Sequence, residues 1–348
     1  MRKQVGILVA ACLYYSGLVK LARRLMQRSD ERLIILNYHR ATGGNLRRHL
    51  LYLRSHYRVL HLEEALQELY ATRDPSKQRR DRRTPLVLTF DDGYVDNYTG
   101  GFALARELQV PITIFLIPGY IESGDRFWWL EGQHLAQQAR AREVTLAGST
   151  YCLTRSEERA KLAQYIDTHL WSVTSVAERE TFLTTLRELL DVPTDGVEDK
   201  VGDGERSLSW AEVREMDKSG VVSFGAHTMH HPILAHLTDT AEIRREVSEC
   251  REVLQQRLHH PVRAFAYPVG RTRHIGEAAI LAVQEAGYDW AVTTMSGINT
   301  RQSDPYQLHR VLGDVSRHWL VMAAEVSGVW SWFSPLWKNH LFNREETQ

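Results

Sequence analysis

The chain of 348 residues is long enough for one large domain or two smaller ones, and its 43% hydrophobic and 25% charged residues are typical of a globular protein. Its 43 basic and 43 acidic residues cancel, so it lacks the strong field that would indicate a nucleic-acid partner, and its one dense basic run, Lys77 to Arg83, is expected to be a solvated loop. Its three cysteines follow no metal-binding or disulfide spacing.

The first 30 residues form an apolar and basic segment that we expect to be separate from the main domain. An apolar stretch from Val5 to Val19 follows Arg2 and Lys3. It is shorter than the about 20 residues that a membrane-spanning helix requires. Three interpretations stay open: an uncleaved signal-like anchor, an interfacial helix that associates with a membrane, and an ordinary helix packed on the domain. A lipoprotein-type processing site at Cys12 is a fourth, which the continuing apolar run disfavours.

Six runs of apolar, β-branched and aromatic residues predict buried strands, and helical patterns lie between them. This alternation predicts an α/β architecture. A capping box, Ser209 with Glu212, marks the start of one helix, and Gly220 suits its end. The strands are expected at 33–38, 86–90, 112–117, 221–226, 263–267 and 290–293, and the helices at 63–70, 101–108, 209–220, 239–258 and 275–286.

Two adjacent carboxylates, Asp91 and Asp92, follow the second predicted strand in the sequence Thr89-Phe90-Asp91-Asp92-Gly93. They stand at the carboxyl end of that strand, where α/β barrels keep their chemistry. Adjacent residues on a strand point to opposite sides. The two acids are therefore expected to differ in role, one holding a cation and the other acting on a water beside it.

Between about residues 121 and 207 the strand pattern disappears. Helical patterns cover residues 155–163 and 177–190, and a segment rich in glycine and aspartate covers residues 195–204. We expect this stretch to be a helical insertion that forms a lid or a wall beside the site.

Two histidines, His227 and His231, follow the fourth predicted strand. Their i, i+4 spacing places both imidazoles on one face if they share a helical turn. Imidazole suits zinc and other late transition metals, and a carboxylate completes a three-ligand site with open positions. Thr228 is expected to cap this turn, and His230 to face away from the metal.

Aromatic residues crowd the last stretch, residues 316–348, which we expect to be a helical extension. Such residues form belts at membrane interfaces, stack on sugars, or pack a helix against the barrel; the last interpretation is the simplest. They are Trp319, Trp330, Trp332, Phe333 and Trp337.

These motifs together resemble the polysaccharide deacetylase family, the NodB-homology domain of the carbohydrate esterases. The resemblance rests on residues 89–93 and 227–232, with supporting segments in the same order at 33–40, 263–270 and 287–293. It implies a distorted (β/α) barrel of the polysaccharide deacetylase type over residues 31–315, interrupted by the helical insertion.

The resemblance implies that Asp92, His227 and His231 bind a divalent metal and that Asp91 is the general base. Zinc is the expected metal, and cobalt, nickel or iron suit the same ligands. It further implies that Tyr267 donates its backbone N–H to the oxyanion.

By the same resemblance Arg263 positions the base carboxylate, with Asp289 as its partner. The general acid is open, because the family's Leu-x-His pattern is absent and Leu308 stands directly before His309. His309 is one candidate, and His39 and His230 are the others.

The implied activity is metal-dependent hydrolysis of N-acetyl groups on amino-sugar units of an envelope polysaccharide or exopolysaccharide. An O-acetyl esterase or another linear amidohydrolase would use the same site. A catalytically idle carbohydrate-binding protein of a polysaccharide assembly system is the alternative from a different class. The expected partner is an N-acetylated polysaccharide, and the expected location is the cell envelope, with the cytoplasm as the alternative.

Overall fold

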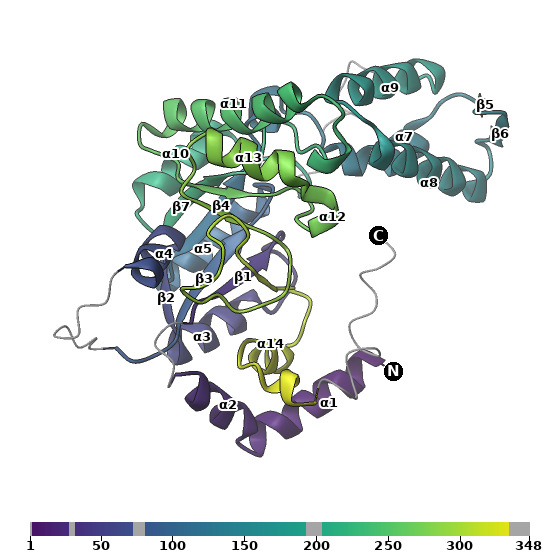
Figure 1. Cartoon of the computed structure of the whole chain (residues 1–348). Coiled ribbons are helices and arrows are strands. Elements are labelled where there is room, and N and C mark those ends of the chain that lie inside the picture. The colour runs from purple at the N-terminus through teal and green to yellow at the C-terminus, as the bar shows by residue number, and fades with distance from the viewer. Residues whose placement is uncertain (1, 28–31, 72–80, 193–203, 334–348) are drawn as a thin grey trace.

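The computed structural model describes residues 2–27, 32–71, 81–192 and 204–333, and its centre is a parallel sheet of eight strands (Figure 1). The six predicted strands all lie within one residue of their expected bounds. Most of their side chains are buried, which is why each strand is a nearly continuous apolar run. The strands are β1 (Ile34–Tyr38), β2 (Arg58–Leu60), β3 (Pro85–Phe90), β4 (Ile112–Leu116), β7 (Val222–Ala226), β8 (Ala264–Ala266), β9 (Trp290–Val292) and β10 (Val311–Leu312).

The sheet curves into a distorted barrel. Its strand order is β10-β1-β3-β4-β7-β8-β9, with β2 beside β3. The chain from Leu308 to Leu312 joins the two ends, because Leu308 pairs with Val292 of β9 and the two residues of β10 pair with β1. Neither β2 nor β10 was predicted, since two or three residues are too few to show a period.

Alternate strand residues face two apolar layers. Leu36 and Leu88 pack among the outer helices, whereas Ile35 and Val87 face the inner layer, which α4 covers at one end. All carboxyl ends of the parallel strands meet at one edge of the barrel, which is where the site lies. The surrounding helices are α3 (Leu46–His56), α4 (Leu62–Tyr70), α5 (Ala103–Leu108), α6 (Pro118–Ser123), α10 (Trp210–Lys218), α11 (Thr240–Leu258), α12 (Thr272–Ile275) and α13 (Glu277–Glu285).

The helix boundaries follow the local signals. The capping box of Ser209 and Glu212 is present at the start of α10. The helix predicted at 101–108 begins earlier, as a π-helical turn over Asn97–Phe102 that leads into α5. The helix predicted at 275–286 is divided, because Gly276 with φ of 75° separates α12 from α13.

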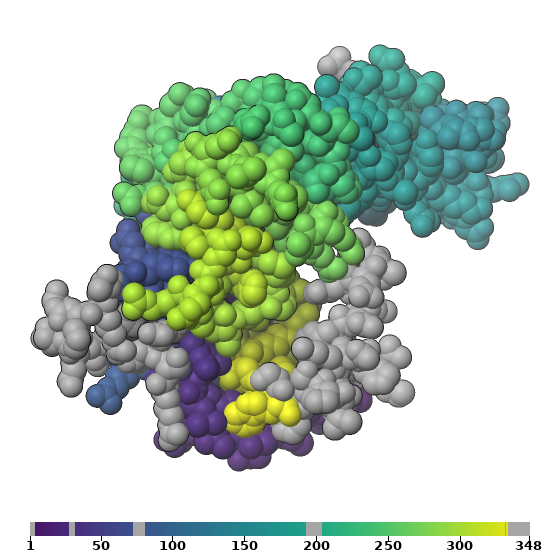
Figure 2. Space-filling view, viewed as in Figure 1, coloured from purple at the N-terminus to yellow at the C-terminus, as the bar shows by residue number. Residues whose placement is uncertain are grey.

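The insertion forms a lobe that projects from the barrel and has an apolar cluster of its own (Figure 2). Both predicted helices are present, but the expectation of no strand is wrong: β5 and β6 form an antiparallel hairpin. Its turn residues Ala147 and Gly148 both have positive φ, as two-residue hairpin turns require. Of the glycine- and aspartate-rich segment only Gly204 is described. The elements are η2 (Trp128–Leu130), α7 (Glu131–Gln138), β5 (Glu143–Leu146), β6 (Ser149–Cys152), α8 (Ser156–Ser172) and α9 (Val176–Leu189).

The N-terminal helices pack against the last described elements, at the opposite end of the molecule from the insertion (Figure 1). Helices α1 (Arg2–Tyr15) and α2 (Leu18–Met26) lie against α14 (Trp319–Val326) and the 3₁₀ turn η5 (Val329–Phe333). The ring of Trp319 lies 5.1 Å from Tyr14 and 5.9 Å from Tyr52 of α3, so this part of the extension packs on the barrel, as expected. Trp337 lies outside the described residues.

Among the described residues, no single helix is long and apolar enough to span a membrane. The segments Gln4–Tyr15 and Leu18–Met26 together have the required length and composition, but they are bent by 69°.

Candidate active site and metal centre

Three turns meet at the carboxyl edge of the barrel, one after each of β3, β7 and β8. Each contains a non-glycine residue with left-handed φ: 71° at Asp92, 63° at Thr228 and 60° at Val269. This geometry costs about 1–3 kcal/mol per residue and persists only where the surrounding structure enforces it, which is commonest at functional sites. The three turns are therefore candidates for function before any side chain is considered.

The histidine turn is not helical, contrary to the prediction. His231 has a left-handed φ of 54°, like Thr228, and this tight turn brings the rings of His227 and His231 to 4.8 Å between centroids. The backbone N–H of His231 donates to the hydroxyl of Thr228 at 2.9 Å. The expected capping role of Thr228 is therefore confirmed.

Asp92, His227 and His231 form a buried group whose ligand atoms all lie within 4.8 Å of one another. Oδ1 of Asp92 lies 3.5 Å from Nε2 of His227 and 3.6 Å from Nε2 of His231. Ligands at about 2.1 Å from a tetrahedral zinc ion are about 3.4 Å apart. The residues thus fit one divalent ion, and the structure brings together all three predicted ligands.

The hydrogen bonds of His227 prepare it as a ligand. Its Nδ1 lies 2.7 Å from the carbonyl oxygen of Ala266, so the N–H donates there and Nε2 carries the lone pair. Burial opposes charge on His227, but its hydrogen bond to Asp92 and the nearby carboxylates outweigh burial and raise its pKa. Burial, with the neighbouring His227, lowers the pKa of His231 to about 3. A metal needs both rings neutral, so its binding releases the proton that His227 otherwise favours.

Asp91 is held by Arg310, a residue that the motifs did not indicate. Nη1 and Nη2 of Arg310 donate to the two carboxylate oxygens at 2.7 Å each, and both side chains are buried. The guanidinium is fixed in turn by the carbonyl of Thr293 and the hydroxyl of Thr89. Burial raises the pKa of Asp91, but the charges of Arg310 and His227 outweigh it and lower the pKa to about 2. Asp91 is therefore ionised at neutral pH, as a general base must be.

The expected role of Arg263 is wrong. Arg263 directly precedes β8, so it lies at the amino edge of the barrel, whereas Asp91 lies at the carboxyl edge. Arg263 and Asp289 do pair, at 3.5 Å, but both side chains are almost half exposed. They form a surface ion pair remote from the base.

The expected oxyanion donor is already occupied. The backbone N–H of Tyr267 donates to the carbonyl of Val292 at 3.2 Å, and its hydroxyl donates to the carbonyl of Tyr306 at 3.0 Å. The backbone N–H of Tyr267 is thus used in a hydrogen bond to a neighbouring strand and is not free to stabilise an oxyanion, contrary to the prediction.

His309 is poorly placed for the general acid. Its ring packs against Gly297, and its backbone N–H donates to Asn299. Because the neighbouring Arg310 points into the barrel toward Asp91, His309 points to the other side. The structure therefore contradicts this candidate.

The other two candidates for the general acid, His230 and His39, lie in different places relative to the metal ligands. His230 faces away from the metal ligands, as expected, with Nδ1 2.7 Å from Glu246. His39 directly follows β1, and the backbone N–H of Asp91 donates to the carbonyl of the preceding Tyr38 at 2.9 Å, so His39 lies at the edge of the barrel that carries both carboxylates. His39 is the candidate that the geometry favours.

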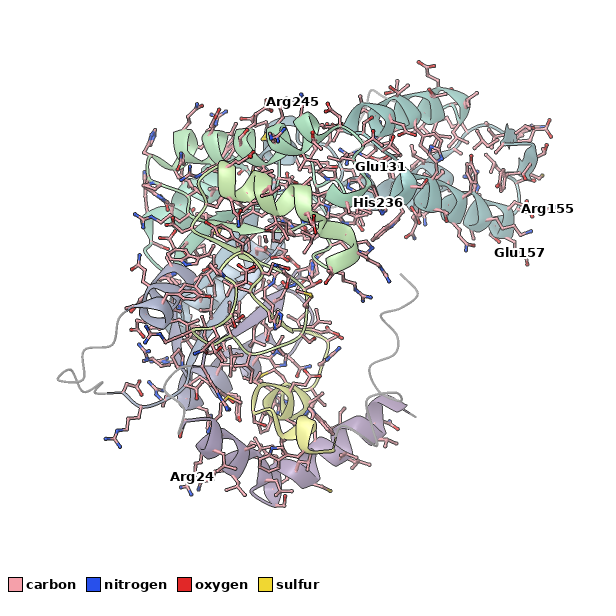
Figure 3. All side chains as sticks on the ribbon, in the orientation of Figure 1. Arg24, Glu131, Arg155, Glu157, His236 and Arg245 are labelled. Carbon is pink, nitrogen blue, oxygen red and sulfur yellow. The ribbon has the colours of Figure 1, made fainter. Side chains whose placement is uncertain are left out.

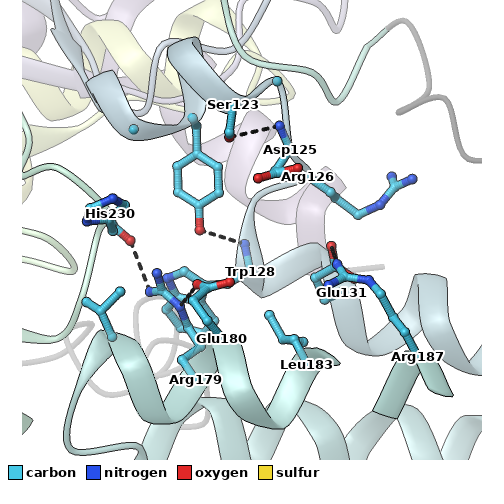
Figure 4. Close-up of a pocket in the computed structure, with 14 residues that line it drawn as sticks. Ser123, Asp125, Arg126, Trp128, Glu131, Arg179, Glu180, Leu183, Arg187 and His230 are labelled. Atoms are coloured by element: carbon cyan, nitrogen blue, oxygen red, sulfur yellow. Dashed lines mark hydrogen bonds and ion pairs between the residues drawn. The ribbon is translucent and has the colours of Figure 1, made fainter. Parts of the chain in front are cut away.

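The insertion braces the backbone of the histidine turn. Nε1 of Trp128 donates to the carbonyl of His231 at 2.9 Å. Nη1 of Arg179 donates to the carbonyl of His230 at 3.0 Å, as Figure 4 shows. Both side chains are buried. These residues, from η2 and α9, hold two consecutive peptide groups of the metal turn, and no local motif identifies them.

We expect Trp128→Phe to weaken metal binding about 10-fold, because removing a bond that orients a ligand typically costs 10–100-fold in metal affinity. The measurement is zinc affinity by competition with a chromophoric chelator. Trp210→Phe is the matched control, because Nε1 of Trp210 is buried without a hydrogen-bond partner among the described residues. Equal affinities for the two variants would contradict the bracing role.

Fold and site together define a (β/α)-barrel protein with a candidate metal centre and a base at the carboxyl edge of its strands. A family model described as polysaccharide deacetylase matches residues 78–291, more than half of the chain. The protein therefore belongs to the polysaccharide deacetylase family, as the motifs predict.

Relatives and solved structures agree with this assignment. YxkH of Bacillus subtilis (strain 168), described as a "putative polysaccharide deacetylase", is 22% identical over 289 residues, which cover 80% of this chain and 71% of YxkH. IcaB from Ammonifex degensii has a TM-score of 0.54 at 17% identity, covering 85% of this chain and 97% of IcaB. The Streptococcus pyogenes deacetylase PplD in complex with acetate has the same TM-score and identity, covering 86% and 99%. These likenesses confirm the predicted barrel fold.

Proposed function

We propose that this protein is a divalent-metal-dependent hydrolase that removes N-acetyl groups from amino-sugar units of an envelope polysaccharide or exopolysaccharide. The observation that carries the proposal is the buried group of Asp92, His227 and His231 beside the Asp91–Arg310 pair. Family membership supports a polysaccharide as the substrate class.

Asp92, His227 and His231 would hold the metal, most often zinc. When bound, it supplies Lewis acidity, which polarises a carbonyl and makes a water a better nucleophile. Asp91 accepts the proton of the attacking water, because it is kept ionised by Arg310 and its two oxygens are fixed in position. His39 gives a proton to the departing nitrogen, since it directly follows β1 at the same edge of the barrel as the carboxylates.

An O-acetyl esterase is the second candidate, because the same base and the same ligands would act on an ester. An idle carbohydrate-binding protein is disfavoured. Sugar binding alone does not require the ionised carboxylate of Asp91, which is buried against Arg310 next to the metal ligands.

The test is acetate release by the purified protein from N-acetylglucosamine oligomers and from an O-acetylated glycan. We expect release from the first, loss after chelation, and recovery on adding zinc. Release from the O-acetylated glycan alone would favour the esterase, and no release from either by metal-loaded protein would refute both.

We also propose that the protein associates with a membrane surface through α1 and α2. Val5, Leu8, Cys12 and Tyr15 follow the spacing of one helix face, and all four are exposed, Leu8 at 65% and Tyr15 at 76%. On α2, Leu21 and Leu25 are also exposed.

Charge supports an anionic lipid surface as the partner. Residues 2–27 include five basic residues and no acidic one. Lys20 and Arg24 are exposed beside Leu21 and Leu25, and Figure 3 shows Arg24 on the outer side of α2. An exposed apolar face flanked by basic residues is the pattern of an interfacial helix.

The double variant Leu8→Glu with Leu21→Glu is expected to bind phosphatidylcholine–phosphatidylserine vesicles at least about 10-fold more weakly, because two apolar side chains leave the lipid phase. Vesicle sedimentation measures this. Leu281→Glu is the control, because Leu281 is 55% exposed on α13. Vesicle binding that survives the double change would remove this surface from consideration.

A further inference from the structure

A large cavity is lined almost wholly by the insertion, with Arg273 from the barrel side, and it lies outside the group of catalytic and metal-binding residues. Its volume is about 1070 Å³, at the upper end of the range for small-molecule sites. Its walls come from η2 and α7, from α8, and from α12 on the barrel side. The ring of Trp171 on α8 lies 6.0 Å from His274 on α12, so the two parts are in contact there.

The cavity begins one aromatic ring away from the metal centre. Trp129 lines it, and the ring of Trp129 lies 4.5 Å from the ring of the metal-ligand candidate His231. Trp128, which holds the His231 carbonyl, lines it as well. The metal centre and this cavity therefore adjoin at Trp129.

The lining combines aromatic rings with polar side chains, both uncharged amides and the arginines Arg159 and Arg273. Trp129 and Trp171 are half-buried, so part of each ring is open, and Gln133, Gln137 and Gln164 add amide groups. A pyranose ring has apolar C–H faces that pack on aromatic rings, and hydroxyl groups that need hydrogen-bond partners. This lining matches both needs, whereas a lipid would leave the amides unpaired.

One carboxyl group on the wall lacks a partner. Oδ1 of Asp167 is buried and makes no hydrogen bond to any described residue, and burial raises the pKa of Asp167. The side chain is fixed by its close contact with Gly132, where any Cβ would meet Oδ1 at 2.0 Å. Oδ1 therefore faces the contact between α7 and α8, where a bound sugar does not reach it, so the polar contacts to a sugar come from the glutamine amides instead.

We propose that this cavity is a saccharide-binding subsite for the units next to the one being deacetylated, with Trp171 stacking on a sugar ring and the amide of Gln164 hydrogen-bonding to a hydroxyl group. This inference rests on the proposed function for its choice of ligand. With this subsite, the insertion would favour the binding of long substrates over single sugars.

The test uses an N-acetylglucosamine hexamer as the probe. In the full chain carrying Asp91→Asn, which should not turn the probe over, calorimetry is expected to show hexamer binding that weakens about five- to tenfold with Trp171→Ala or with Gln164→Ala. With Asp91 intact, the ratio of kcat/KM for hexamer to that for monomer should fall by a similar factor. Trp332→Ala is the matched control, because Trp332 is 44% exposed on η5.

The outcomes separate the two proposals. If the wild-type protein releases no acetate but hexamer binding weakens as described, the deacetylase function fails and the subsite stands. If acetate is released but neither variant changes hexamer affinity or the kinetic ratio, the subsite is wrong. Absence of hexamer binding by the Asp91→Asn protein would overturn it as well.

Discussion

Asp91→Asn is expected to lower kcat/KM for N-acetylglucosamine oligomers about a thousandfold, within the range that general-base catalysis supplies. An amide has the shape of the carboxylate but cannot take a proton from water. The metal ligands Asp92, His227 and His231 are untouched, so zinc content by elemental analysis should stay at the wild-type value. The measurement is therefore a pair: steady-state acetate release, and metal per chain.

His309→Ala is the control for this experiment, because the His309 ring packs against Gly297 on the side away from Asp91. Its activity should stay within about twofold of wild type, as for most surface changes of small effect. If Asp91→Asn kept more than a tenth of the activity, Asp91 would not be the base. If zinc were lost at the same time, the loss of activity would reflect the metal site and not proton transfer.

The main strands and the metal group could be predicted because their signals are local. Each buried strand is a run of apolar residues; His227 stands directly after such a run, and Asp92 stands two residues after another. Parallel strands carry their carboxyl ends to one edge, so residues 135 positions apart in the chain could be expected to meet.

Arg310 was missed because its signal is short. It lies between Leu308, which pairs with β9, and a strand of only two residues, so no periodic pattern marks the segment. Alternation was the available clue: Leu308 and Arg310 share one face and His309 takes the other. Since Leu308 is buried, the residue two positions further on, Arg310, is expected to point into the barrel, and His309 between them is expected to point away from it.

The bracing residues could not have been predicted from local sequence. Trp128 lies on η2 and Arg179 on α9, and each meets the histidine turn only through the packing of the insertion on the barrel. A tryptophan or arginine on a helical pattern is indistinguishable from a core or surface residue until the tertiary contact is known.

Asp91 makes the free energy of unfolding of the metal-free protein depend on pH. Arg310→Met is expected to reverse the direction of that dependence. In the wild type the pKa of Asp91 is lowered to about 2 from the usual 3.8. A lowered pKa stabilises the fold at pH values above about 4, by about 2 kcal/mol, and that contribution is lost as the pH falls toward 2. Without Arg310, burial dominates and the pKa lies above 3.8, so stability falls as the pH rises through about 4.

At pH 7.5 Arg310→Met should therefore be about 3–5 kcal/mol less stable than wild type, because an unpaired carboxylate stays buried. At pH 4.5 the difference should be smaller, because a larger share of Asp91 is then protonated in the variant. Urea unfolding in EDTA at the two pH values measures this. Arg310→Lys retains the positive charge, so its stability difference from wild type should change much less between the two values. A deficit for Arg310→Met that is the same at both pH values would mean that packing, and not charge on Asp91, is what Arg310 supplies.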